Sequence, residues 1–185
     1  NSNTSIGLSA SGTGSIPSFT GTNLGTTPQV ATIVVTPTYT EAGVSCTGPS
    51  KTFTITVNPT AQVNQPNSQV RCNGEAITPI GFSTQNTVGT TTYSWTNSNP
   101  SIGIPASGSG AIPAYTVVNS GATPQVATIT ITATYSNAGK SCTTAKSFTI
   151  TVYPSPKATI SSTNSFIVCQ NDVPPSVTFT GSNGT

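Results

Sequence analysis

Alternating apolar and polar residues form the most regular pattern in this chain. Over residues 127–135 every apolar side chain is followed by threonine, and residues 92–96 and 148–152 alternate in the same way. A period of two residues is that of a β-strand with one face on a core and the other towards solvent. No stretch has the three-to-four-residue spacing of an amphipathic helix. The pattern therefore predicts an all-β fold.

Turn-forming residues separate the alternating stretches, so the strands should be short. Asparagine, glycine, serine and proline cluster at residues 73–74, 97–100, 108–110, 119–121 and 137–139. Such clusters mark turns and loops. About seven short strands between these breaks predict a two-sheet, immunoglobulin-like sandwich.

The apolar members of the strands are the candidate core. Trp95 could instead be an exposed platform for a sugar, but it alternates in phase with Tyr93 in the middle of a strand. That position favours a buried tryptophan. The predicted core residues are Tyr93, Trp95, Ile129, Ile131, Tyr135, Phe148 and Ile150.

The sequence also repeats itself with a period of about 96 residues. That length is typical of one immunoglobulin-like sandwich. One departure from the repeat is Pro37. Its repeat partner, Ala133, lies inside the most regular predicted strand, residues 127–135. Because proline cannot donate to a sheet, Pro37 must lie at an edge, a bulge or a strand end. The matching stretches are residues 5–17 with 101–113, 27–33 with 123–129, and 53–57 with 148–152.

The repeat divides the chain into three segments. Residues 59–154 form a complete repeat, residues 1–58 the C-terminal part of a preceding one, and residues 155–185 the N-terminal part of a further one. Two explanations stay open: a continuous array, or ends of neighbouring chains that complement each other. The stiff linkers predicted between the segments contain Pro59, Pro154 and Pro156.

Composition narrows the range of partners. Charged residues are 4% of the chain and the net charge is +2, with the charges scattered. Scattered charge gives no binding surface for nucleic acid. No apolar run approaches the ~20 residues of a spanning helix, so no membrane insertion is expected.

The residue inventory argues against catalysis. The chain contains no histidine, which excludes Ser-His-Asp and Cys-His arrangements within it. Glycoside hydrolysis needs two carboxylates, and the complete repeat has only Glu75, whose place after a cysteine favours a turn-capping role. Clustered metal ligands and a nucleotide-binding glycine motif are lacking too. We expect no enzyme activity, no catalytic residue, no metal site and no cofactor.

Two cysteines per repeat suggest disulfides and an oxidising compartment. One possibility joins Cys72 to Cys142 within the complete repeat, leaving Cys46 and Cys169 to partners outside the chain. The alternative joins Cys46 to Cys72 and Cys142 to Cys169, and so links successive repeats. The first is favoured, because the hairpin loop that contains Cys142 should lie at the end of its repeat opposite the next repeat. It would then be far from the early strand of the next repeat, which follows Cys169.

Several motifs together resemble one family. Cys72-Asn-Gly, Tyr93-Ser-Trp-Thr-Asn97 and Phe148-Thr-Ile-Thr-Val-Tyr-Pro154 are similar to the PKD-like repeats of very large surface and secreted proteins of Bacteroidetes, including gliding-motility-type adhesins. The resemblance spans the whole chain. It implies a tandem array of sandwiches, export by the type IX route and a place on the cell surface, and it brings no catalytic residue.

These observations predict an extracellular stalk or fibre whose partners are neighbouring copies of the same repeat. One alternative is an array of carbohydrate-binding modules that uses exposed aromatic residues such as Phe19, Tyr115 or Tyr153 to contact surface glycans, a host or a substratum. A second alternative is a fibre subunit completed by strand exchange between chains.

Overall fold

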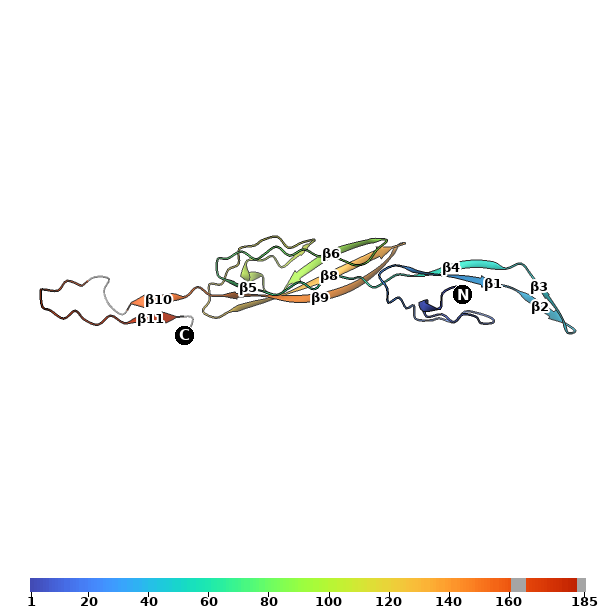
Figure 1. The fold of residues 1–185 in the computed structure, drawn as a ribbon, viewed down its shortest axis with the longest axis horizontal. Helices are drawn as coiled ribbons and strands as arrows, with labels where there is room; N and C mark the ends of the chain where they lie inside the picture. Colours follow the sequence, from blue (N-terminus) through green and yellow to red (C-terminus); the bar gives the residue numbers. More distant parts are fainter. Residues whose placement is uncertain (161–165, 183–185) are drawn as a thin grey trace. The chain divides into compact units, whose positions relative to one another are not determined.

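The computed structural model of the protein describes residues 1–160 and 166–182. These residues form β-strands and two short 3-10 turns, η1 and η2, with no α-helix among them (Figure 1). The all-β expectation is confirmed at this level, and the sheets are consistent with a β-sandwich.

The chain divides into two compact units. The first unit comprises residues 1–64, 82–93 and 132–145, and the second comprises residues 65–81, 94–131 and 146–185. Strands β6, β8 and β9 have residues in both.

The N-terminal segment contains two antiparallel strand pairs. Its elements are η1 (Thr4–Ile6), β1 (Gln29–Val35), β2 (Thr38–Glu41), β3 (Val44–Thr47) and β4 (Lys51–Val57). β1 pairs with β4 and β2 pairs with β3. Pro37 lies between the ends of β1 and β2, as expected for a residue that cannot donate to a sheet. Ile6, Ala31 and Ile33 form a small core at the β1–β4 pair.

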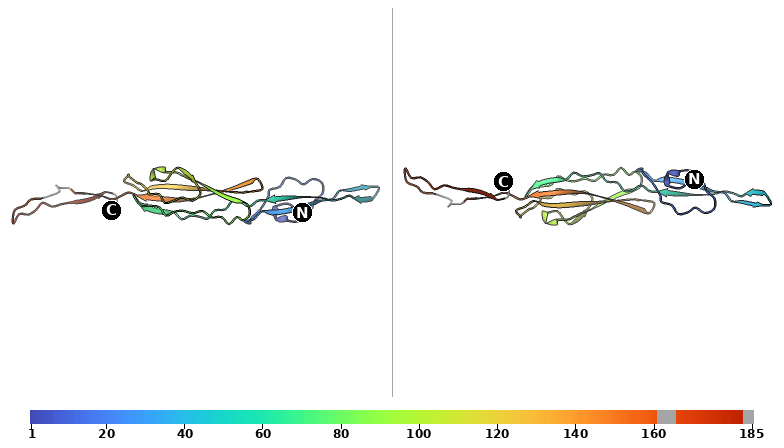
Figure 2. Two further views of the ribbon diagram at one scale, coloured as in Figure 1. Left: turned by 90° about the horizontal axis from the view of Figure 1, so that it is seen from above. Right: turned by 90° about the horizontal axis from the view of Figure 1, so that it is seen from below.

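The complete repeat is built on a five-stranded sheet with the order β5-β9-β8-β6-β7 (Figures 1 and 2). β5 lies parallel to β9 at one edge, and β7 lies antiparallel to β6 at the other. The bounds are β5 (Gln69–Cys72), β6 (Thr90–Asn97), η2 (Pro100–Ile102), β7 (Ser107–Ser109), β8 (Gln125–Asn137) and β9 (Lys140–Tyr153).

The layer opposite this sheet is mostly extended chain without regular strands. Ala76 bridges to Thr116, and Ile80 bridges to Ile112, each as an isolated antiparallel contact. The count of about seven strands is therefore too high. A turn predicted at residues 108–110 also proves wrong in part, because β7 includes Gly108 and Ser109. Glycine usually weakens a strand. Here the absence of a side chain at Gly108 leaves room for the ring of Trp95.

The core follows the alternation of β8 and β9. Six of the seven predicted core residues are buried, namely Trp95, Ile129, Ile131, Tyr135, Phe148 and Ile150. Tyr93 is half-buried and packs on Phe82 with ring centroids 5.5 Å apart. Its face of β6 was predictable, but alternation does not reveal how much of that face is covered.

Two hairpins turn on the same pair of residues. Ala138 and Gly139 connect β8 to β9 with φ angles of 49° and 75°, and Ala42 and Gly43 connect β2 to β3 with 48° and 80°. Positive φ at both central residues is the signature of a type I′ turn, whose twist matches that of the strands.

Equivalent loops of the two repeats make the same hydrogen bonds. The Asn3 amide donates to Gln29 Oε1 (3.1 Å), and the amide of its counterpart Asn99 donates to Gln125 Oε1 (3.3 Å). The sequence repeat is thus also a repeat of local structure.

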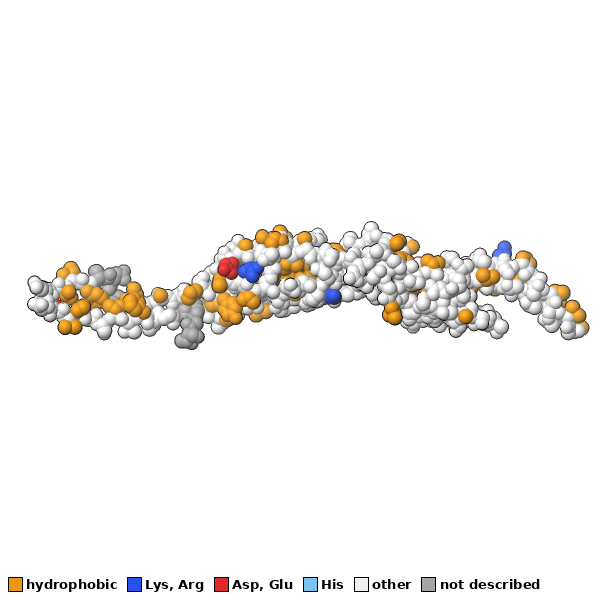
Figure 3. All heavy atoms as spheres, in the orientation of Figure 1, with side chains coloured by type: hydrophobic (Ala, Val, Ile, Leu, Met, Phe, Trp, Pro, Cys, Tyr) orange, Lys and Arg blue, Asp and Glu red, His pale blue; other side chains and the backbone are white. Residues whose placement is uncertain are grey.

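The C-terminal segment forms a hairpin of its own. β10 (Lys157–Ile160) pairs antiparallel with β11 (Phe179–Ser182). Apolar side chains gather on the surface of this segment (Figure 3). Among them, Ile160 and Phe179 are exposed.

Candidate functional site

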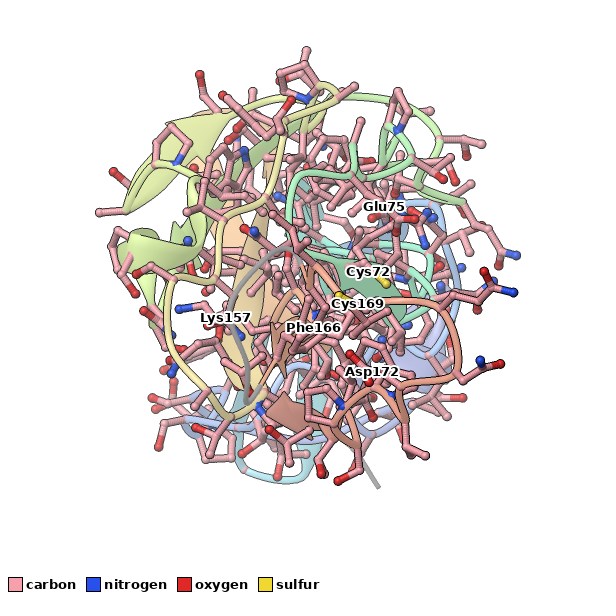
Figure 4. The ribbon with its side chains drawn as sticks, turned by 90° about the vertical axis from the view of Figure 1, so that its left-hand side faces the viewer. Cys72, Glu75, Lys157, Phe166, Cys169 and Asp172 are labelled. Atoms are coloured by element: carbon pink, nitrogen blue, oxygen red, sulfur yellow. The ribbon has the colours of Figure 1, made fainter. Side chains whose placement is uncertain are left out.

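A cysteine and a carboxylate close a tight turn at the end of β5. The Cys72 backbone N–H donates to Glu75 Oε2 (2.8 Å), and the Glu75 N–H donates to the Cys72 carbonyl (3.1 Å). Gly74 has a φ of 88° at the centre of the turn, a conformation that favours glycine. Figure 4 marks Cys72 and Glu75 at this turn. Glu75 therefore has a turn-capping contact.

The same turn recurs in the C-terminal segment. The Cys169 N–H donates to Asp172 Oδ2 (3.0 Å), and the Asp172 N–H donates to the Cys169 carbonyl (3.1 Å). Asn171 takes the place of Gly74 with a φ of 75°, and asparagine tolerates that region better than most residues. The turn is thus a repeated structural feature (Figure 4).

Asn73 connects this turn to the end of the repeat. Its N–H donates to the Tyr153 carbonyl (2.9 Å), its Nδ2 donates to Ser155 Oγ (3.0 Å), and its Oδ1 accepts from the Asn119 N–H (2.8 Å). These contacts fix the chain where the complete repeat ends, around the predicted linker residues Pro154 and Pro156.

Asn119 is the buried centre of the network. Its Nδ2 donates to the carbonyls of Thr123 (2.9 Å) and Val152 (2.7 Å), and its Oδ1 accepts from the Gly121 N–H (3.0 Å). Asn23 makes the equivalent bonds in the N-terminal segment but is only half-buried. The recurrence of asparagine at an offset of 96 was a signal for this role that the sequence interpretation missed.

We expect Asn119→Ala to lower the free energy of unfolding by about 2–3 kcal/mol, because it leaves buried carbonyl and N–H groups without partners. Asn23→Ala is the matched control. Its loss should stay below about 1 kcal/mol, since water can reach the groups left behind. Urea unfolding followed by circular dichroism measures both. Equal losses would mean that burial does not set the cost.

A second cluster joins Asn58, beside the linker residue Pro59, to the hairpin between β8 and β9. Asn58 Nδ2 donates to the Asn137 carbonyl (3.0 Å) and to the Lys140 carbonyl (3.5 Å), and Asn137 Nδ2 donates to Asn58 Oδ1 (3.0 Å). All these residues belong to the first compact unit. We call Asn58, Asn137 and Lys140 the linker clasp.

The cysteines correct one prediction. All four are free thiols, with Cys142 half-buried and Cys46, Cys72 and Cys169 exposed. Cys72 pairs with Tyr153 at the end of β9, whereas Cys142 is the third residue of that strand. Eleven residues of strand span roughly 36 Å, far beyond the limit of about 7 Å between the Cα atoms of a disulfide. A Cys72–Cys142 bond within one repeat does not fit this structure.

The buried aromatic residues carry two polar groups without partners. The Trp95 indole nitrogen and the Tyr135 hydroxyl are buried and accept or donate no hydrogen bond. Burial raises the pKa of the Tyr135 hydroxyl above its ordinary value, and the nearby Cys142 raises it further. Tyr135 is therefore neutral in the folded protein near pH 7.

The candidate sugar-binding aromatics differ in exposure. Phe19 packs on the core of Ile6, Ala31 and Ile33. Tyr115 is half-buried, and Tyr153 is exposed at the end of β9.

The described residues contain neither a metal-binding cluster nor a membrane-spanning helix. Residues 1–160 and 166–182 hold no group of three or more His, Cys, Asp or Glu side chains placed to bind a metal ion. In the same ranges, no helix has the length and apolarity to cross a membrane.

Comparison with known proteins adds no relative. No protein-family model matches the sequence, and no curated protein matches it.

Proposed function

We propose that this chain is part of an extracellular structural or adhesive protein, a stalk or fibre of PKD-like sandwiches on a bacterial cell surface. The observation that carries the proposal is the recurrence of local structure with the sequence repeat. Asn3 and Asn99 make the same contacts, as do Asn23 and Asn119. A repeated module that is rebuilt in such detail suits a protein that works by extension.

The linker clasp supports the structural role. A bare proline linker limits bending only through its own backbone, whereas Asn58 is also hydrogen-bonded to Asn137 and Lys140. The surface location and the type IX route rest on the resemblance of residues 72–74, 93–97 and 148–154 to PKD-like repeats. Antibodies against the complete repeat should then label intact cells. Labelling only after permeabilisation would contradict the location.

Small-angle X-ray scattering of the chain tests the structural role. A compact globule of this length has a radius of gyration of about 16 Å, and we expect a value well above it. Asn58→Ala should broaden the distribution of interatomic distances, because the linker clasp is lost. Asn137→Ala should act alike, and the double variant should add little to either. A radius near 16 Å would overturn the proposal.

Glycan binding is a separate prediction. Tyr153 is exposed, and a glycan array probed with the chain should show hits that Tyr153→Ala removes. An array without hits leaves the structural role as it stands.

A further inference from the structure

The complete repeat holds its first strand parallel to its last. β5 is the first strand of the repeat and β9 is the last, and they pair over residues 69–72 and 150–153. A parallel pair cannot be joined by a tight turn, so most of the repeat lies between the two strands in the chain. The chain thus enters the sheet through β5 and leaves it through β9.

The parallel direction decides how a pull on the chain acts on this pair. The chain before Gln69 pulls β5 towards its N-terminal end, and the chain after Tyr153 pulls β9 towards its C-terminal end. Because the strands point the same way, these two pulls slide them past each other along their common axis. The hydrogen bonds of the pair then resist together, whereas a pull across one end of the pair would break them one after another.

Hydrogen bonds outside the pair extend it in both directions. Before β5, Ser68 Oγ accepts from the Thr149 N–H (3.0 Å) and from Thr149 Oγ1 (3.1 Å). After β5, the Asn73 N–H donates to the Tyr153 carbonyl (2.9 Å). The bonded stretch is therefore longer at both ends than β5 itself, which has 4 residues.

The layer opposite the sheet also holds β5. The Gln69 side chain donates to the Thr78 carbonyl and accepts from the Thr78 N–H (2.9 Å each). Arg71 Nε donates to the Ala76 carbonyl (2.9 Å), and Arg71 Nη2 donates to Thr78 Oγ1 (2.7 Å). Ala76 in turn bridges to Thr116 within that layer. A pull on β9 is therefore passed through β5 to the rest of the repeat.

We propose that residues 68–73 and 149–153 form a shear clamp, a bonded strand pair that resists tension applied to the two ends of a repeat. The inference rests on the proposed stalk or fibre, because a chain held at both ends is under tension. It goes beyond that proposal by naming the element that resists the tension. While the shear clamp holds, the other strands stay folded, so the repeat should resist up to a threshold force and then unfold in one step.

Single-molecule force spectroscopy of the full chain tests the direction of loading. Handles on the two chain ends slide β5 along β9. Handles on Cys72 and on a Pro156→Cys variant, with the other cysteines replaced by serine, pull the same pair apart from one end. Unfolding of the repeat is recognised by the length released, about 3.3–3.6 Å per residue. At one loading rate, we expect end-to-end unfolding to need more than about twice the force of the second geometry, because forced unfolding follows the unfolding barrier.

Two variants of Asn73 test the clamp itself. Within its turn only Gly74 has a positive φ, the pattern of a type II turn, in which proline is common at the position of Asn73. Asn73→Pro therefore fits the turn and removes the N–H that bonds to Tyr153, so it should lower the end-to-end unfolding force. Asn73→Ala keeps that N–H and should lower the force less.

A substitution at the other edge of the sheet is the control for stability in general. Gly108→Ala places a methyl group against Trp95 in the β6–β7 pair. It should lower the stability to urea but leave the unfolding force nearly unchanged, because the β6–β7 contacts are still intact when the shear clamp breaks. Equal forces in the two loading geometries, or equal losses of force in Asn73→Pro and Gly108→Ala, would overturn the shear clamp. A large radius of gyration of the same chain would still leave the proposed function intact.

Discussion

Replacement of Phe148 by alanine should lower the free energy of unfolding by about 3–5 kcal/mol. Phe148 lies in the middle of β9 and is 4% exposed. Its removal takes away the transfer free energy of the ring and leaves a cavity that close-packed neighbours fill only in part. The single tryptophan, Trp95, lies in the same sheet and reports unfolding of the complete repeat by fluorescence.

The repeat supplies a matched control for this variant. Phe53 is the counterpart of Phe148, but it is 46% exposed, and among the described residues its strand β4 pairs only with β1. Phe53→Ala should therefore cost less than about 1 kcal/mol. Urea unfolding by fluorescence and by circular dichroism compares the two variants. Similar losses would show that the exposure of the ring does not set the cost of its removal.

Gly108→Ala should cost about 2–3 kcal/mol, a large effect for the addition of one methyl group. A Cβ atom at Gly108 would lie 2.6 Å from Trp95 Cε2 and still closer to Cζ2. Gly108 pairs directly with Trp95 across β6 and β7, and the ring is 3% exposed. Because the ring is buried, an added methyl group requires that β7 separate from β6 or that the tryptophan leave its rotamer.

Gly12 is the repeat counterpart of Gly108 and serves as the control. No atom lies within 4 Å of a Cβ added there, so Gly12→Ala should change stability by less than about 0.5 kcal/mol. Thermal unfolding and the Trp95 emission maximum follow the effect. If Gly108→Ala and Gly12→Ala both unfold like the parent chain, then packing of the Trp95 ring does not require a glycine at position 108.

The disulfide prediction failed for a reason that local sequence could not reveal. Two cysteines in one repeat and the length of the repeat suggested an internal bond. β5, however, lies parallel to β9 and beside its last residues, which places Cys72 at the opposite end of that strand from Cys142. Pairing between residues 69 and 150 has no short-range signature, because turns and alternation constrain only neighbours in the chain.

The polar network of the site was predictable only in part. The position of Glu75 after a cysteine and an Asn-Gly pair indicated a turn cap. Asn119 and the linker clasp escaped notice, since the recurrence of asparagine at an offset of 96 marks a repeated loop position but does not reveal which groups the side chain contacts. Their roles come from burial of Asn119 beneath the end of β9 and from the approach of Asn58 to the β8–β9 hairpin.

The all-β class, the alternation of the strands, the repeat and most of the core could be predicted from the residues, because a period of two fixes which face of a strand is apolar. The folded chain was needed to show which strands are neighbours, how far each face is covered and which repeated residues stay exposed. Coverage depends on segments distant in the chain, and for that reason Phe53 and Phe148 share a sequence environment but differ in burial.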